Sequence, residues 1–127
     1  MASKYILTAA RAEAESSFEP RFQVHTNLLT DTEHIQTIWS KFEPGGTYPQ
    51  HAHPHEQFSV MLQGRMRLTV GGEVEEIGPG DMWYAPANVS HGGELLGDEP
   101  VVFIDVYAPP GQEIYDFLKG IWPKPAE

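Results

Sequence analysis

Residues 45–64 read GGTYPQHAHPHEQFSVMLQG and hold three of the chain's six histidines within a short run. His51 and His53 lie two positions apart, so on a β-strand both imidazoles point to the same face, about 6–7 Å apart at their bases. Gln57 keeps the same parity and offers a neutral carbonyl oxygen. Glycines at positions 45 and 64 are typical turn residues. The segment therefore predicts a strand region that directs several ligands at one metal ion.

Composition limits the class of protein. The 127 residues are enough for one domain with a sizeable core. The formal net charge is −10, with no basic stripe, which argues against nucleic acid or an anionic membrane as a partner. There is no cysteine, so metal ligands must be histidine, carboxylate or amide. The first residues lack a signal-peptide core and no apolar run reaches membrane-spanning length, so we expect a cytoplasmic protein.

Short runs of β-branched and aromatic residues alternate with Gly, Pro and Asn turns. Such runs predict at least seven short strands, with hardly any helical pattern, and indicate an all-β sandwich or barrel. The flanks of Gly64 are expected to form one hairpin and the flanks of Gly71-Gly72 a second. The predicted strands include residues 21–29, 34–43, 57–63, 65–70 and 101–107.

We expect a single domain, residues 1–127, with an N-terminal arm at 1–20, a barrel at about 21–108 and a tail at 109–127. The arm suits either a short helix or an extended segment. In the tail, residues 111–122 place Ile114, Phe117, Leu118 and Ile121 at helical spacing. This short C-terminal helix is expected to cap the barrel or to pack on a partner.

Two segments resemble the two sequence motifs of the cupin superfamily. The first contains the paired histidines quoted above and Gln57, where cupins more often have Glu. The second runs from Gly80 to His91, with Asn88 in place of its glycine and Leu95 in place of its closing Asn. Together they cover about 50 residues. The resemblance implies a cupin-type jelly-roll β-barrel.

The resemblance also implies a metal ion inside the barrel. Three imidazole nitrogens and one oxygen suit a first-row divalent ion such as Zn, Ni, Fe or Mn, and leave positions open for water or substrate. A neutral amide leaves the ion its full double charge, which favours Lewis-acid work. Strict alternation would also direct His55 at the ion, so His55 is an alternative to Gln57. The ligands implied are His51, His53, Gln57 and His91.

Asp105 is a second chemical candidate because it stands in the apolar run VVFIDVY, residues 101–107. An unpaired buried charge costs several kcal/mol, so this carboxylate either points at solvent or has a function. Facing the cavity, Asp105 would lie near the metal as a general acid or base. If it faces outward, Asp105 would be an ordinary solvent-exposed carboxylate with no role in a site. Strand parity leaves both orientations open.

Within the cupins, HAHPHEQ (51–57) and DVYAPP (105–110) resemble the small proteins of pectin degradation that linearise 4,5-unsaturated uronates. The resemblance implies Asp105 as the catalytic aspartate and Tyr107 as an aromatic pocket residue, with an organic or sugar acid as substrate. That family tends to carry an arginine shortly after this strand to hold the substrate carboxylate. This chain has Gly111-Gln112 there, and Arg65 or Arg67 is the candidate substitute.

Three functions follow from these patterns. The first is a metal-dependent enzyme of isomerase or lyase type, with the ion as Lewis acid and Asp105 as proton carrier. A non-haem iron dioxygenase is the second, because three histidines also suit Fe(II) and O2. The third is a non-catalytic binding domain. Exposed edge strands favour a homodimer. Large residues that could form pocket walls are Trp39, Phe42, Met61, Met66, Trp83 and Tyr84.

Overall fold

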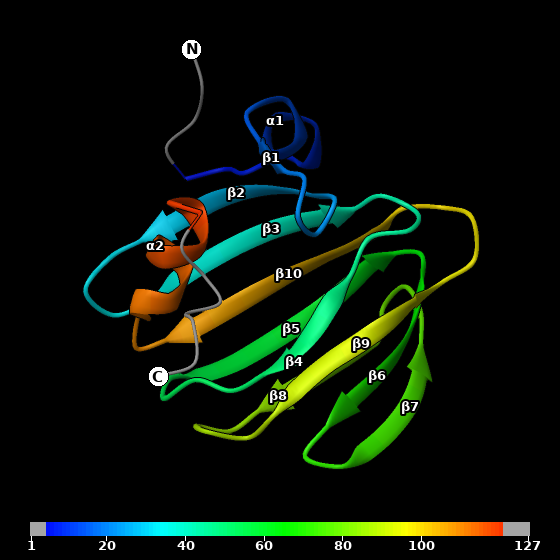
Figure 1. Ribbon diagram of the computed structural model, residues 1–127. Coiled ribbons are helices and arrows are strands. Elements are labelled where there is room, and N and C mark those ends of the chain that lie inside the picture. Colours follow the sequence, from blue (N-terminus) through cyan, green and yellow to red (C-terminus); the bar gives the residue numbers. More distant parts are fainter. Residues whose placement is uncertain (1–4, 121–127) are drawn as a thin grey trace.

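The computed structural model describes residues 5–120, and its strands form two antiparallel sheets (Figure 1). The larger sheet has six strands in the order β1-β2-β3-β10-β5-β8. Its strands far apart in sequence, such as β3 and β10, are hydrogen-bonded neighbours. In spatial order these six are β1 (Ser17–Glu19), β2 (Val24–Asp31), β3 (Gln36–Phe42), β10 (Val101–Ala108), β5 (Glu56–Gln63) and β8 (Met82–Ala85).

The smaller sheet has four strands in the order β4-β9-β6-β7 and lies across from the first (Figure 1). Because strands 4 to 10 alternate irregularly between the two sheets, the chain repeatedly crosses from one to the other. This arrangement is a jelly roll and confirms the predicted all-β cupin-type fold. The four strands are β4 (Tyr48–His51), β9 (His91–Leu96), β6 (Arg65–Val70) and β7 (Glu73–Ile77).

Gly64 marks a crossing between the sheets, so the prediction of a hairpin at this glycine is wrong. β5 pairs with β10 and β8, whereas β6 pairs with β7 and β9. Gly64 has φ +83°, and a Cβ there would lie 2.5 Å from the carbonyl oxygen of Pro100. A tight turn and a crossing both favour glycine at positive φ, so the local pattern does not separate them. The second hairpin, β6–β7 through Gly71-Gly72, is confirmed.

The main core lies where the inward faces of the strands meet. Phe42 and Phe103 stack with ring centroids 5.4 Å apart, and Trp83 meets Phe103 edge-on. Burial of such rings and of the methionines beside them supplies most of the stabilisation of a sandwich of this size. The buried members of this cluster are Val24, Phe42, Met61, Met66, Leu68, Trp83, Val101 and Phe103.

Most of the residues predicted as pocket walls therefore have a packing role. Met61, Met66 and Trp83 belong to the core. Of the six residues predicted as pocket walls, only Phe42 also lines the cavity described below. Trp39 packs in a separate cluster with Ala12. Tyr84 is half exposed on the outer face of β8.

Both ends of the described chain contain a short helix. In the arm, α1 (Ala9–Ala14) begins after Thr8, whose hydroxyl accepts a hydrogen bond from the Arg11 backbone N–H, and β1 follows, so the arm contains both predicted forms. In the tail, α2 (Gln112–Leu118) is confirmed as a helix; Ile114 is buried, whereas Ile121 lies outside the described residues. Neither helix of residues 5–120 has the length and apolarity needed to cross a membrane.

Replacement of Gly64 by alanine is expected to destabilise the protein by about 2–5 kcal/mol. Left-handed backbone strain contributes about 1–2 kcal/mol, and the overlap with the Pro100 carbonyl contributes about 1–3 kcal/mol. Gly72→Ala is the matched control, because Gly72 has φ +86° but no atom within 4 Å of an added Cβ. Urea denaturation of the two variants measures their free energies of unfolding. Equal losses in the two variants would contradict the crossing geometry at Gly64.

Candidate metal centre

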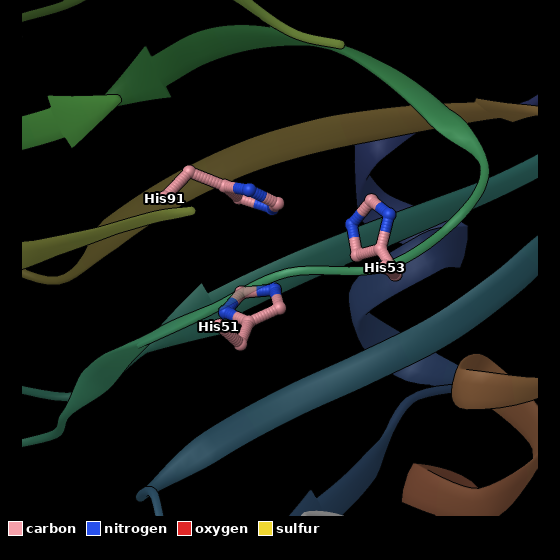
Figure 2. A group of neighbouring side chains, drawn as sticks. All are labelled: His51, His53 and His91. Atoms are coloured by element: carbon pink, nitrogen blue, oxygen red, sulfur yellow. The ribbon is translucent and has the colours of Figure 1, made fainter. Parts of the chain in front are cut away.

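Three imidazoles from two separate segments meet at one end of the smaller sheet (Figure 2). His51 ends β4, and its direct partner in the neighbouring strand is His91, the first residue of β9. His53 lies beyond the end of β4, so strand alternation is not what unites it with His51. The ring centroids of His91 lie 4.3 Å from His51 and 4.8 Å from His53. The structure thus brings the three predicted imidazoles together.

Each of the three rings is oriented by a backbone carbonyl. The Nδ1 atom of His51 is 2.8 Å from the oxygen of Pro49, and the Nδ1 atoms of His53 and His91 are each 2.9 Å from a carbonyl oxygen. A carbonyl only accepts hydrogen bonds, so each Nδ1 carries the proton. In the neutral ring Nε2 then carries no proton, and its lone pair can bind a metal ion. The three Nε2 atoms are therefore prepared as metal ligands, as in many metal sites.

Two of the three imidazoles, His51 and His91, have a lowered pKa and are neutral near pH 7. The pKa of His51 is lowered to about 3, mainly by burial and in part by the neighbouring His91. Burial also lowers the pKa of His91. Protons therefore do not compete strongly for these nitrogens near pH 7, which suits metal binding.

Gln57 lies in β5 and its side chain is completely buried. Its Oε1 atom is 3.0 Å from Nε2 of His53 and 2.9 Å from Nε2 of His91. Its amide nitrogen donates to Ser59 Oγ at 2.9 Å and to Asp105 Oδ1 at 3.1 Å, which directs the oxygen at the imidazoles. Amide oxygen and imidazole nitrogens thus present lone pairs to one another with no hydrogen between them.

This arrangement fits a cation. Unshared lone pairs repel one another, and a positive ion at the point where they converge removes that repulsion. One ring nitrogen of each of His51, His53 and His91 lies within 4.8 Å of the other two. Ligands about 2.1 Å from one ion can be at most about 4.2 Å apart, so small ring rotations suffice. The buried triad is a candidate metal site whose ion the donor set does not identify.

His55, the predicted alternative to Gln57, is not part of the His51, His53 and His91 triad, but it forms a second candidate metal-binding group with His53 and Glu113, whose ligand atoms lie within 4.8 Å of one another. Its ring stacks on that of His53, with centroids 3.9 Å apart and an interplanar angle of 5°. Burial lowers its pKa to about 4, and its buried Nε2 has no hydrogen-bond partner among the described residues. The ring also fills the space beside Gly111, where an added Cβ would lie 2.0 Å from its Cε1 atom.

Asp105 points inward from β10 and is 4% exposed, so the structure selects the cavity-facing orientation. Its Oδ1 atom accepts a hydrogen bond from Ser59 Oγ at 2.5 Å, and its Oδ2 atom accepts one from Tyr107 Oη at 3.2 Å. Burial raises the pKa of Asp105 to about 7, although the hydrogen bonds from Ser59, Tyr107 and Gln57 oppose this shift. A carboxyl group with this pKa can both accept and donate a proton near neutral pH.

Tyr107 lies two residues beyond Asp105 on the same face of β10 and is buried. Its ring meets those of His53 and His55 edge-on, with centroids 5.5 and 4.7 Å away. Its hydroxyl supports the Asp105 carboxyl rather than the imidazoles. Burial and the nearby Asp105 raise the pKa of Tyr107 well above its ordinary value, so its hydroxyl stays a donor.

Sequence reasoning missed three residues of this site. Ser59 shares the parity of Gln57 on β5 and stands directly opposite Asp105 in the ladder, a signal that requires the strand register. Tyr48 on β4 has its hydroxyl 3.5 Å from the Gln57 amide nitrogen. Glu113 comes from α2, and no local pattern relates it to the histidines.

A pocket that opens to solvent lies between His51 and α2, and its space amounts to about 510 Å³ when the open part is included. His51, Asp105 and Tyr107 line it together with aromatic rings, and no Lys or Arg occurs among the described residues of its wall. Arg65 and Arg67, predicted as possible holders of a substrate carboxylate, are exposed on β6 and pair with Glu76 and Glu94. That prediction is wrong, because outward positions of β6 cannot reach the cavity.

Comparisons with known proteins agree with this geometry. Residues 38–107 match the family model described as "Cupin domain". Oxalate decarboxylase OxdC of Bacillus subtilis is 32% identical over 71 residues, which cover 51% of this chain. An uncharacterised protein of Streptomyces coelicolor is 29% identical over 68 residues, or 54% of this chain. The chain spans only 18% and 64% of the lengths of these two curated relatives.

Solved structures share the fold. An RmlC-like cupin from Shewanella frigidimarina superposes with a TM-score of 0.72 at 21% identity, covering 85% of this chain and 93% of the other. KdgF from Halomonas superposes with a TM-score of 0.69 at 25% identity, covering 77% and 89%. The first similarity shows the fold alone.

Removal of one imidazole tests the metal centre. The protein is expected to bind one equivalent of a first-row divalent ion, and His91→Ala is expected to weaken binding by about 100-fold or more, since loss of outer-shell partners alone typically costs 10–100-fold. His34→Ala is the control, because His34 is an exposed residue whose side-chain contact is Glu33. Titration calorimetry on chelator-treated protein measures both, and unchanged binding by His91→Ala would exclude the triad as the site.

Proposed function

The chain belongs to the cupin family, and from this premise we propose that it is a metal-dependent enzyme acting on a small organic molecule. The ion is held by the three imidazoles and Gln57, and Asp105 carries a proton to or from the substrate. The observation that supports this most is the convergence of three unprotonated Nε2 atoms and one amide oxygen beside a buried carboxyl group. The cavity next to them gives a substrate access to both.

The chemistry divides between the ion and the chain. A divalent ion bound here would polarise a substrate oxygen and acidify the neighbouring carbon or hydroxyl. Asp105 faces the same cavity and holds the proton that leaves or joins the substrate. Ser59 and Tyr107 fix the two carboxyl oxygens, so the proton is exchanged from a defined position. This division of roles suits an isomerase or lyase type of reaction.

The substrate class is the finer part of the proposal. The resemblance to the uronate-linearising proteins and the similarity to KdgF favour ring opening of an unsaturated sugar acid. Asp105 and Tyr107 are both buried on the same face of β10, which supports the roles that this resemblance implies for them. The arginine expected to hold the substrate carboxylate is absent, and Gly111 stands there beside the His55 ring. A substrate panel must therefore include uncharged analogues as well as the uronate.

A non-haem iron dioxygenase is the second candidate. It is favoured by the neutral donor set of three imidazoles, which suits Fe(II), and by the aromatic wall of the cavity. Oxygen uptake that requires Fe(II) and a substrate would support it. A third outcome, full metal loading with no turnover of any substrate, would indicate a binding domain.

Asp105→Asn is expected to retain the metal and to lose turnover by about 10²–10⁴-fold, because the amide cannot exchange a proton with the substrate. The assay measures loss of an unsaturated uronate or its uncharged analogues, with oxygen consumption followed in parallel. Asp98→Asn on an exposed loop is the matched control. Full activity of Asp105→Asn would remove the aspartate from the mechanism.

We also propose that the chain forms a homodimer through the outer face of β5 and β8. β8 is the edge strand of the larger sheet, and large apolar side chains stand outward beside it. Burying them against a second copy would remove this surface from water. The exposed residues are Phe58, Leu62, Met82 and Tyr84.

Light scattering tests the assembly. The wild-type protein is expected to run as a dimer, and Met82→Glu as a monomer, because the charge would be buried in the interface. Val74→Glu is the control, since Val74 on β7 has a similar exposure, 56% against 59% for Met82. A wild-type monomer at high concentration, or a dimeric Met82→Glu, would refute this interface.

A further inference from the structure

A carboxylate from the C-terminal helix lies over the imidazole cluster. Glu113 is in the first turn of α2, and its side chain is 14% exposed. Its Oε1 atom is 4.0 Å from Nε2 of His51 and 3.9 Å from Nε2 of His53. These distances are longer than a hydrogen bond. Glu113 therefore lies within reach of an ion bound by His51 and His53, and it also forms a group with His53 and His55 that could hold an ion.

Among residues 5–120, no cationic side chain lines the cavity beside this carboxylate. The described wall of the cavity contains neither Lys nor Arg, while Asp105 lies in the same cavity and Asp116 is buried one turn further along α2. The pKa of Glu113 is raised to about 8, mainly by burial and in part by the charges of Asp105 and Asp116. A buried carboxylate without a counter-charge is unfavourable, whereas one that binds a metal ion is compensated.

The start of α2 is held in place, which fixes the position of Glu113. Gln36 of β3 accepts a hydrogen bond from the Gly111 backbone N–H at 3.1 Å and returns one to its carbonyl oxygen at 3.4 Å. Ile114, the residue after Glu113, is buried against Ile38 and Tyr107. The carboxylate is therefore directed inward by contacts on both sides, not by chance rotation of an exposed chain.

We propose that Glu113 is a further ligand of the ion, so that α2 supplies the carboxylate that Gln57 lacks. This inference rests on the proposed metal site and adds a residue to it. Distances of 3.9–4.0 Å to two imidazole nitrogens lie within the span of about 4.2 Å that two ligands of one ion can have. Four ligands come from the barrel and the fifth from the helix. An ion with six ligand positions would keep one of them for substrate.

Cobalt binding gives a readout that does not depend on turnover. Co(II) affinity is measured by competition with a chromophoric chelator, and the visible d–d absorption bands report the ligand set. Glu113→Gln and Glu113→Ala are both expected to bind Co(II) about 10–100-fold more weakly and to shift the bands. Asp116→Asn is the matched control, since it removes one negative charge from the same helix, and is expected to stay within about twofold with unchanged bands.

The outcomes separate the ligand from its alternatives. Weaker binding with unchanged absorption bands in both Glu113 variants would mean that Glu113 acts only through its charge, and would overturn the proposal. Affinity equal to that of the wild type would overturn it as well. Absence of Co(II) binding by the wild-type protein would instead refute the metal site and the proposed function together. Circular dichroism of the metal-free variants verifies that each is folded.

Discussion

The site depends on three hydrogen bonds that run from Nδ1–H of an imidazole to a backbone carbonyl. These bonds settle which nitrogen of each ring lacks a proton, and all three unprotonated nitrogens face the same point. Gln57 adds an amide oxygen there because Ser59 and Asp105 engage its nitrogen. A set of buried acceptors with no donor between them is unfavourable. The geometry is consistent with a cation as the missing partner.

The same hydrogen bonds connect metal binding to proton transfer. Gln57 lies opposite Tyr107 and Ser59 lies opposite Asp105 in the β5–β10 ladder, so a ligand and the carboxyl group stand on neighbouring strands. Backbone pairing holds such positions more rigidly than loops would. The Gln57 amide spans the two, with its oxygen toward the imidazoles and its nitrogen toward Asp105. Any shift of one group is therefore transmitted to the other.

Much of the fold was predictable because turn residues and alternating strands are local signals. The histidine spacing and Asp105 in its apolar run pointed to the residues that meet in the structure. The sheet crossing at Gly64 was not predictable, because hairpins and crossings make the same demand on a glycine. Ser59 required the strand register. Glu113 required the docking of α2, which depends on contacts between residues about 75 positions apart, such as Gln36 with Gly111.

The contact between His55 and Gly111 has an evolutionary consequence. An imidazole occupies the volume into which any side chain at position 111 would grow. The two positions should therefore vary together among descendants of this sequence: an arginine at 111 requires a smaller or differently turned residue at 55. Such a lineage would exchange a neutral stacked ring for a positive charge at the rim of the site.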